Sequence, residues 1–162
     1  MRPDPARLAS LAAVLTKDLE AIDRLDAELR QMLPGLQAAP AAFRDLAAAA
    51  YTLHAVYTAL ENTFDQISRT FENHVVDPRQ WHRELLRKMF LEIPGVRPAV
   101  LPEELRSVLT DLRGFRHVFR HAYDLQLDPE RLCRLAAAWQ RSKAELVEAL
   151  RRFRTHLLPE VR

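Results

Sequence analysis

The residues best suited to chemistry lie between positions 113 and 124, where arginine and histidine alternate with aromatic side chains. Arg116 and His121 are the central pair, with His117, Arg120 and Tyr123 beside them. A guanidinium group is permanently charged and can hold a phosphate bidentately, and an imidazole can move a proton near neutral pH. Together they suit phosphodiester cleavage, in which an RNA 2′-hydroxyl attacks the adjacent phosphorus without a metal and forms a 2′,3′-cyclic phosphate.

The same cluster also has a simpler interpretation as a solvated helix end. Arginine and histidine near a helix C-terminus complement the helix dipole. On an unbroken helix Arg116 and His121 are about 140° apart, at about 100° per residue. They converge only if the helix ends near His121 or if a second subunit supplies one of them. Arg116 also lies beside the apolar positions Leu109 and Leu112, so its charge needs a partner or a ligand.

The elements that position these residues are predicted to be helices, because apolar residues recur every three or four positions almost throughout. Asp-Pro pairs favour helix starts and Pro-Gly pairs favour helix ends. We expect an all-α, antiparallel bundle of four long helices plus one short helix. The expected helices are 5–33, 41–74, a short one opened by Asp77-Pro78 and ended by Pro94-Gly95, one from near Pro102 to about 121, and one from Pro129.

Composition places the chain among globular proteins of one domain. The chain has 162 residues, of which 48% are hydrophobic and 28% charged. No stretch approaches the ~20 apolar residues of a membrane span, and the N-terminus lacks the apolar segment of a signal peptide. We therefore expect a cytoplasmic protein without membrane contact. The long N-terminal helix would precede a core of about 41–157 within a single domain, 1–162.

Charge and cysteine content narrow the possible cofactors and partners. The net charge of +2 and the pI of about 9.0 give weak support for an anionic partner. Cys133 is the only cysteine, which excludes an internal disulfide and a multi-cysteine zinc site. The histidines show no spacing that pairs two of them with a third metal ligand. We therefore predict neither a metal nor a cofactor.

Three segments resemble a known family when they are taken together. Residues 116–123 match the pattern R-x4-H-x-Y of the HEPN ribonuclease superfamily, specifically the HepT-like toxins. The run 51–62, with its aromatic residues and Glu61-Asn62, is similar to the long helix of those proteins, and 81–86 (WHRELL) also looks like this family. These segments cover roughly residues 45–140 in the expected order. A lone R-x4-H is common by chance, but the combination is much more specific.

The resemblance implies a small helical domain that dimerises, with the arginine and histidine of each subunit lining a cleft at the interface. It implies a metal-independent endoribonuclease acting on RNA, paired with a nucleotidyltransferase antitoxin. By this resemblance Arg116 would hold the phosphate, His121 would be the general acid/base, and Tyr123 would be the position that receives AMP. The family often has a polar residue such as asparagine after the arginine. Here it is His117, which could assist catalysis or be a neutral substitute.

Other polar residues remain open to more than one interpretation. Glu61 could orient Arg116 and Asn62 could hydrogen-bond across the cleft, or both could belong to a solvated polar seam. His82 belongs to a family-like segment, but we interpret it as a partly buried residue at a helix start. Two other functions also fit the chain. One is a catalytically silent HEPN module that binds RNA or a protein, and the other is a dimerising helical scaffold.

Overall fold

The apolar spacing of the chain produces five α-helices. The computed structural model describes residues 3–72, 80–121 and 126–158. The helices are α1 (Pro5–Leu36), α2 (Phe43–Phe71), α3 (Trp81–Met89), α4 (Arg106–His121) and α5 (Pro129–Leu157), with a 3-10 turn, η1 (Glu103–Leu105), before α4. The structure is 81% helical, and no strand occurs in the part of the chain it describes. The expected all-α bundle of four long helices and a short one is confirmed.

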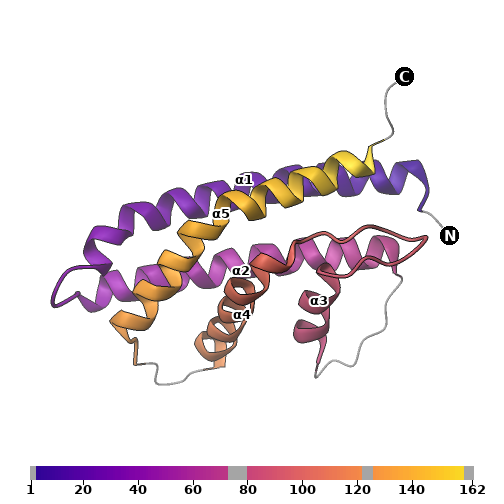
Figure 1. Cartoon of the computed structure of the whole chain (residues 1–162). Coiled ribbons are helices and arrows are strands. Elements are labelled where there is room, and N and C mark those ends of the chain that lie inside the picture. Colours follow the sequence, from indigo (N-terminus) through magenta and orange to yellow (C-terminus); the bar gives the residue numbers. More distant parts are fainter. Residues whose placement is uncertain (1–2, 73–79, 122–125, 159–162) are drawn as a thin grey trace.

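The long helices form two layers around α2 (Figure 1). α1 and α2 form an antiparallel hairpin, and α5 begins on the side of α4 and crosses the bundle to run beside α1 toward its C-terminal end. α3 and α4 pack on the opposite side of α2. The apolar stripes of all these helices meet in one core, in which Trp139, Tyr57 and Phe64 are the largest fully buried side chains. α2 is therefore the central helix, and it contacts every other helix.

The helix starts at Pro5 and Pro129 agree with the sequence, whereas the predicted end of the first helix at residue 33 is wrong. The Asp4 and Asp128 side chains accept backbone N–H groups at 3.0 Å and so act as N-caps. α1 continues through Pro34 and Gly35 to Leu36. A proline removes only one helical hydrogen bond, and this loss is tolerable in the final turn. A Cβ on Gly35 would lie 2.9 Å from Cγ of Asp45, so the glycine lets α2 approach closely.

The segment between α3 and α4 also departs from expectation. α3 ends at Met89, five residues before Pro94, and the predicted start at Asp77-Pro78 lies outside the described residues. The buried side chain of Arg97 donates to three carbonyls, those of Lys88, Leu91 and Pro98, and forms an ion pair with Glu72 at the end of α2. These bonds hold the non-helical segment against the bundle and replace the helical hydrogen bonds it lacks.

The first turn of α1 and the last turn of α5 lie at the same end of the bundle (Figure 1). Arg154 of α5 donates to the Thr16 hydroxyl of α1 at 3.0 Å, which ties the two helices together near that end. Nearer the middle of α1, the buried Asp26 accepts hydrogen bonds from Trp139 and Gln140 of α5, each at 2.9 Å. None of the described helices is both long enough and apolar enough to span a bilayer.

Candidate functional site

A buried carboxylate on α2 connects three helices at the position of the sequence motif. Oε1 of Glu61 lies 3.2 Å from Nη1 of Arg116 on α4. Oε2 of the same carboxylate lies 2.7 Å from Nδ1 of His82 on α3. The side chains of Glu61 and Arg116 are only 5% and 11% exposed, whereas that of His82 is 41% exposed. We call Glu61, Arg116 and His82 the Glu61 cluster.

The position of Arg116 follows from the face of α4 on which it lies. Leu109, Leu112 and Phe115 bury that face against the bundle, and Arg116 is adjacent to it. Its Nε donates to the Thr58 hydroxyl at 3.1 Å, one turn before Glu61 on α2. Thus two of its nitrogens are fixed by α2, and Nη2 has no hydrogen bond within the described part of the chain. The partner that the charge of Arg116 requires is Glu61, and one donor remains available for an anion.

His54 lies one turn before Thr58 and packs against the end of α4. Its ring centroid is 5.2 Å from that of Phe119. Burial lowers the pKa of His54, and the positive charges of Arg116 and Arg120 lower it further. The imidazole therefore favours its neutral form more than a free histidine does.

Tyr57 lies one turn before Glu61 and is fully buried. Its hydroxyl has no hydrogen-bond partner among the residues that the structure describes. Burial raises the pKa of Tyr57, and the nearby charge of Glu61 raises it further. The phenol therefore stays protonated beside the Glu61 cluster, where it contributes apolar contact rather than charge.

The structure places His121 apart from the Glu61 cluster within one chain. α4 runs unbroken through His121, so the rotation of about 140° from Arg116 applies. His121 pairs with His117 on the exposed side of the helix, with ring centroids 4.6 Å apart. Arg120 is also exposed, and Tyr123 lies outside the described residues. On α2, Asn62 is exposed next to the buried Glu61. One chain thus presents Arg116 and His121 on different faces of α4.

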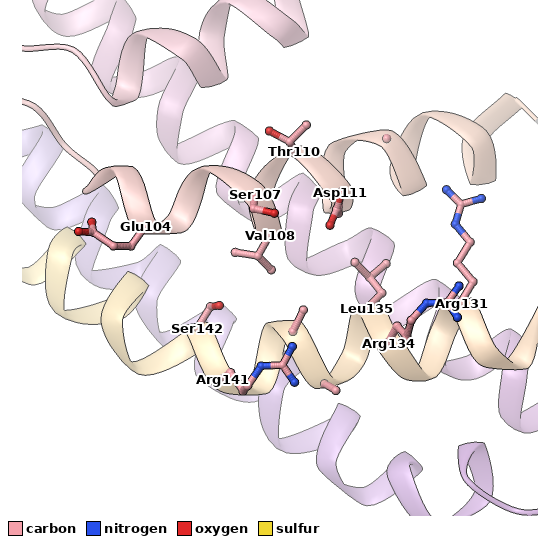
Figure 2. Close-up of a pocket in the computed structure, with 13 residues that line it drawn as sticks. Glu104, Ser107, Val108, Thr110, Asp111, Arg131, Arg134, Leu135, Arg141 and Ser142 are labelled. Atoms are coloured by element: carbon pink, nitrogen blue, oxygen red, sulfur yellow. The ribbon is translucent and has the colours of Figure 1, made fainter.

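A groove of about 730 Å³ lies between α4 and α5, and Arg116 is not among the residues that line it (Figure 2). Figure 2 shows Ser107 and Asp111 on the α4 side and Arg131, Arg134 and Arg141 on the α5 side. Gly114 also lines it, and a Cβ built there would meet nothing within 4 Å. The groove is therefore separate from the Glu61 cluster, and none of the three cluster residues lines it.

Metal-binding geometry is absent from the described segments. No group of three or more His, Cys, Asp or Glu side chains in residues 3–72, 80–121 and 126–158 could hold a metal ion. The Glu61 cluster has two such side chains, but its carboxylate is already used by Arg116 and His82. What it offers is hydrogen-bonding and proton-transfer chemistry.

These features define an all-helical domain in which one buried carboxylate, Glu61, contacts both Arg116 and the imidazole of His82. The family described as HepT-like protein matches residues 48–157. This is most of the chain, so the protein belongs to the HepT-like family, which lies within the HEPN nuclease superfamily. No curated protein and no solved structure matches the chain.

The contact between His82 and Glu61 was not foreseen from the sequence. The resemblance singled out the segment 81–86, but the interpretation of His82 was a residue at a helix start. It does lie in the first turn of α3, and its ring packs at 4.7 Å against that of Trp81. Glu61 and His82 are 21 positions apart and lie on different helices, so helical spacing could not relate their directions. Only the packing of α3 on α2 shows the pair.

Proposed function

We propose that this protein is a metal-independent endoribonuclease that cleaves RNA by attack of a 2′-hydroxyl on the adjacent phosphorus. The observation that supports this best is Arg116, which is fixed by Glu61 and Thr58 and whose Nη2 has no hydrogen bond to any described residue. A preorganised guanidinium can stabilise the negative charge that develops on phosphorus as the new bond forms. Its place in the R-x4-H-x-Y pattern of a HepT-like protein supports the same role.

In this proposal Arg116 binds the phosphate and His121 transfers a proton, while Arg120 adds positive charge at the end of α4 and His117 is available to assist. Arg116 and His121 lie on different faces of α4, so we propose a homodimer in which His121 of one copy meets Arg116 of the other. The protein is proposed to be the toxin of a toxin–antitoxin pair. A nucleotidyltransferase antitoxin would transfer AMP to Tyr123, adding bulk and negative charge two residues from His121, which repels a substrate phosphate.

The direct test uses purified protein and a 5′-labelled RNA in the presence of EDTA. Wild-type protein should produce fragments that end in a 2′,3′-cyclic phosphate, and an RNA with 2′-deoxy residues should stay intact. Arg116→Ala and His121→Ala should each lower kcat/KM at least about 100-fold. Arg24→Ala and His156→Ala remove the same chemical groups from exposed positions elsewhere and should match wild type. Intact RNA with folded wild-type protein would contradict the proposal.

A second candidate is a catalytically silent HEPN module that binds RNA or a protein. It is favoured by one observation, namely that α4 is unbroken through His121 and separates it from Arg116 in a single chain. In that case wild type should bind RNA without cleaving it. His121→Ala should bind equally well, and Arg116→Ala should bind more weakly because a phosphate contact is lost. Filter binding at several salt concentrations would measure both effects.

A further inference from the structure

Among the residues that the structure describes, His82 is the one histidine within hydrogen-bond distance of Glu61. A carboxylate can only accept hydrogen bonds, so the ring nitrogen 2.7 Å from Oε2 of Glu61 must carry a proton. That nitrogen is Nδ1. In the neutral ring the lone pair is therefore on Nε2, the opposite nitrogen. Glu61 thus selects the tautomer of His82 and aims its basic nitrogen away from the carboxylate.

The surroundings of His82 leave that nitrogen accessible. The side chain is 41% exposed, and Nε2 has no hydrogen bond to any described residue. One edge of the ring is fixed by Trp81, with centroids 4.7 Å apart at an interplanar angle of 71°. Glu61 also binds Arg116, so the imidazole and the guanidinium are held on the same carboxylate. Since both groups contact one carboxylate, the proposal requires that a phosphate bound to Arg116 place its ribose within reach of His82.

Cleavage by a 2′-hydroxyl needs proton transfer at two places. The attacking and leaving oxygens lie in line on opposite sides of phosphorus, so a single imidazole cannot serve both at once. The sequence motif supplies only His121 with a proposed role in proton transfer. The structure separates His121 from Arg116 within a chain, whereas His82 shares a carboxylate with Arg116.

On the basis of the proposed ribonuclease function, we propose that His82 is the general base of the reaction and that Glu61 is its positioning residue. Nε2 of His82 takes the proton from the 2′-hydroxyl as the bond from O2′ to phosphorus forms. The bond from phosphorus to O5′ breaks, and the leaving oxygen takes a proton from His121. The products are a 2′,3′-cyclic phosphate and a 5′-hydroxyl. His82 then loses a proton to solvent and His121 gains one.

The tautomer of His82 can be measured without any RNA. Long-range ¹H–¹⁵N spectra of protein with ¹⁵N-labelled histidine distinguish a protonated Nδ1 from a protonated Nε2. His82→Gln identifies its resonances, and the exposed His156 serves as an internal reference. We expect the neutral ring of His82 to carry its proton on Nδ1, and Glu61→Gln to reduce this preference. A neutral ring with its proton on Nε2 would overturn the role of Glu61, whatever the fate of the proposed function.

A substrate whose bridging 5′-oxygen is replaced by sulfur distinguishes loss of the general base from loss of the general acid. A thiolate leaves without protonation, so loss of a general acid is rescued on this substrate and loss of a general base is not. We expect His82→Ala to lower kcat at least about 100-fold on both substrates. His121→Ala should be slow on the oxygen substrate and close to wild type on the sulfur substrate. His156→Ala is the matched control and should match wild type on both.

The outcomes separate this role from the proposed function. If the wild type cleaves RNA and His82→Ala cleaves it within about twofold of the wild-type rate, the role of His82 is overturned. The proposed ribonuclease function would then still stand. Rescue of His82→Ala by sulfur makes it an acid and also overturns the assignment. Wild-type protein that cleaves neither substrate overturns both proposals. If Glu61 is only a structural link between helices, Glu61→Gln should lower the free energy of unfolding and leave kcat of the folded fraction unchanged. We instead expect kcat to fall while KM stays within a few fold.

Discussion

At the scale of single residues, two buried carboxylates each connect side chains from different helices. Glu61 joins α2 to α3 and α4, and Asp26 joins α1 to α5. In each case the carboxylate accepts from side chains far apart in the sequence. Burying such a charge is favourable only when its hydrogen bonds are made, so each one specifies a single arrangement of its helices. Removing either should therefore have a large effect.

Asp26→Ala should lower the free energy of unfolding by about 2–4 kcal/mol, because it leaves the buried indole N–H of Trp139 without an acceptor. It also removes ion pairs with Arg30 at 3.0 Å and Lys143 at 3.9 Å. Urea unfolding followed by circular dichroism measures the change. The matched control is Asp23→Ala, whose half-exposed carboxylate pairs with Lys143 at 2.6 Å. Its cost should stay below about 1 kcal/mol. Equal costs for the two variants would contradict this account.

The lowered pKa of His54 makes part of the stability depend on pH. Below the ordinary histidine value of 6.5 the unfolded chain binds this proton more readily than the folded chain. The contribution is therefore complete above that pH and is lost as the pH falls. His54→Gln should reduce the loss of stability between pH 7.5 and pH 5, as measured by urea unfolding at both pH values. The exposed His156→Gln should leave the wild-type loss unchanged, and an unchanged loss in His54→Gln would contradict the prediction.

At the scale of elements, α4 has a glycine in its middle that packing does not require. A Cβ on Gly114 meets nothing within 4 Å, and its backbone is helical. Gly114→Ala should therefore raise the free energy of unfolding by about 0.5–1 kcal/mol, because alanine loses less conformational entropy on folding. Thermal melting measures it. Gly95→Ala is the opposing control, since its φ of 74° is strained for alanine, and it should lower the melting temperature. A lower melting temperature for Gly114→Ala would contradict the conclusion that position 114 has room for a side chain.

The helices themselves were largely predictable, because their apolar spacing and Asp-Pro starts are local signals. Pro34 shows the limit of this reasoning, since α1 continues past it to Leu36 although a Pro-Gly pair favours a helix end. The candidate site was predictable in part. Arg116 lies next to an apolar stripe and so had to meet a polar partner, and Glu61 was one suggested partner. The addition of His82 depends on how α3 packs against α2, and no periodicity within either helix encodes that packing.

At the scale of the whole molecule, the proposed dimer makes a sharp prediction about mixed subunits. Suppose that each site combines Arg116 of one copy with His121 of the other. A dimer of one Arg116→Ala chain and one His121→Ala chain then has one intact site and one doubly altered site. Refolding the two inactive variants together at equal amounts should restore about a quarter of wild-type activity, because half of the dimers are mixed.

The control for this experiment is refolding of each variant alone, which should stay inactive. If both residues acted within the same chain, every site in the mixture would lack one of them and no activity would return. Light scattering on the wild type measures the oligomeric state directly. A monomer at the concentrations at which RNA is cleaved would contradict the shared site, and it would require another residue of the same chain to replace His121.

The shared end of α1 and α5 has a consequence for protein engineering. A domain whose first helix starts and whose last helix finishes at the same end of the bundle can be inserted into a surface loop of a host protein. A short flexible linker at each junction would suffice. Placed inside a fluorescent host, the bundle would report its own folding and unfolding as changes in light emission. Variants that alter its stability could then be ranked in living cells.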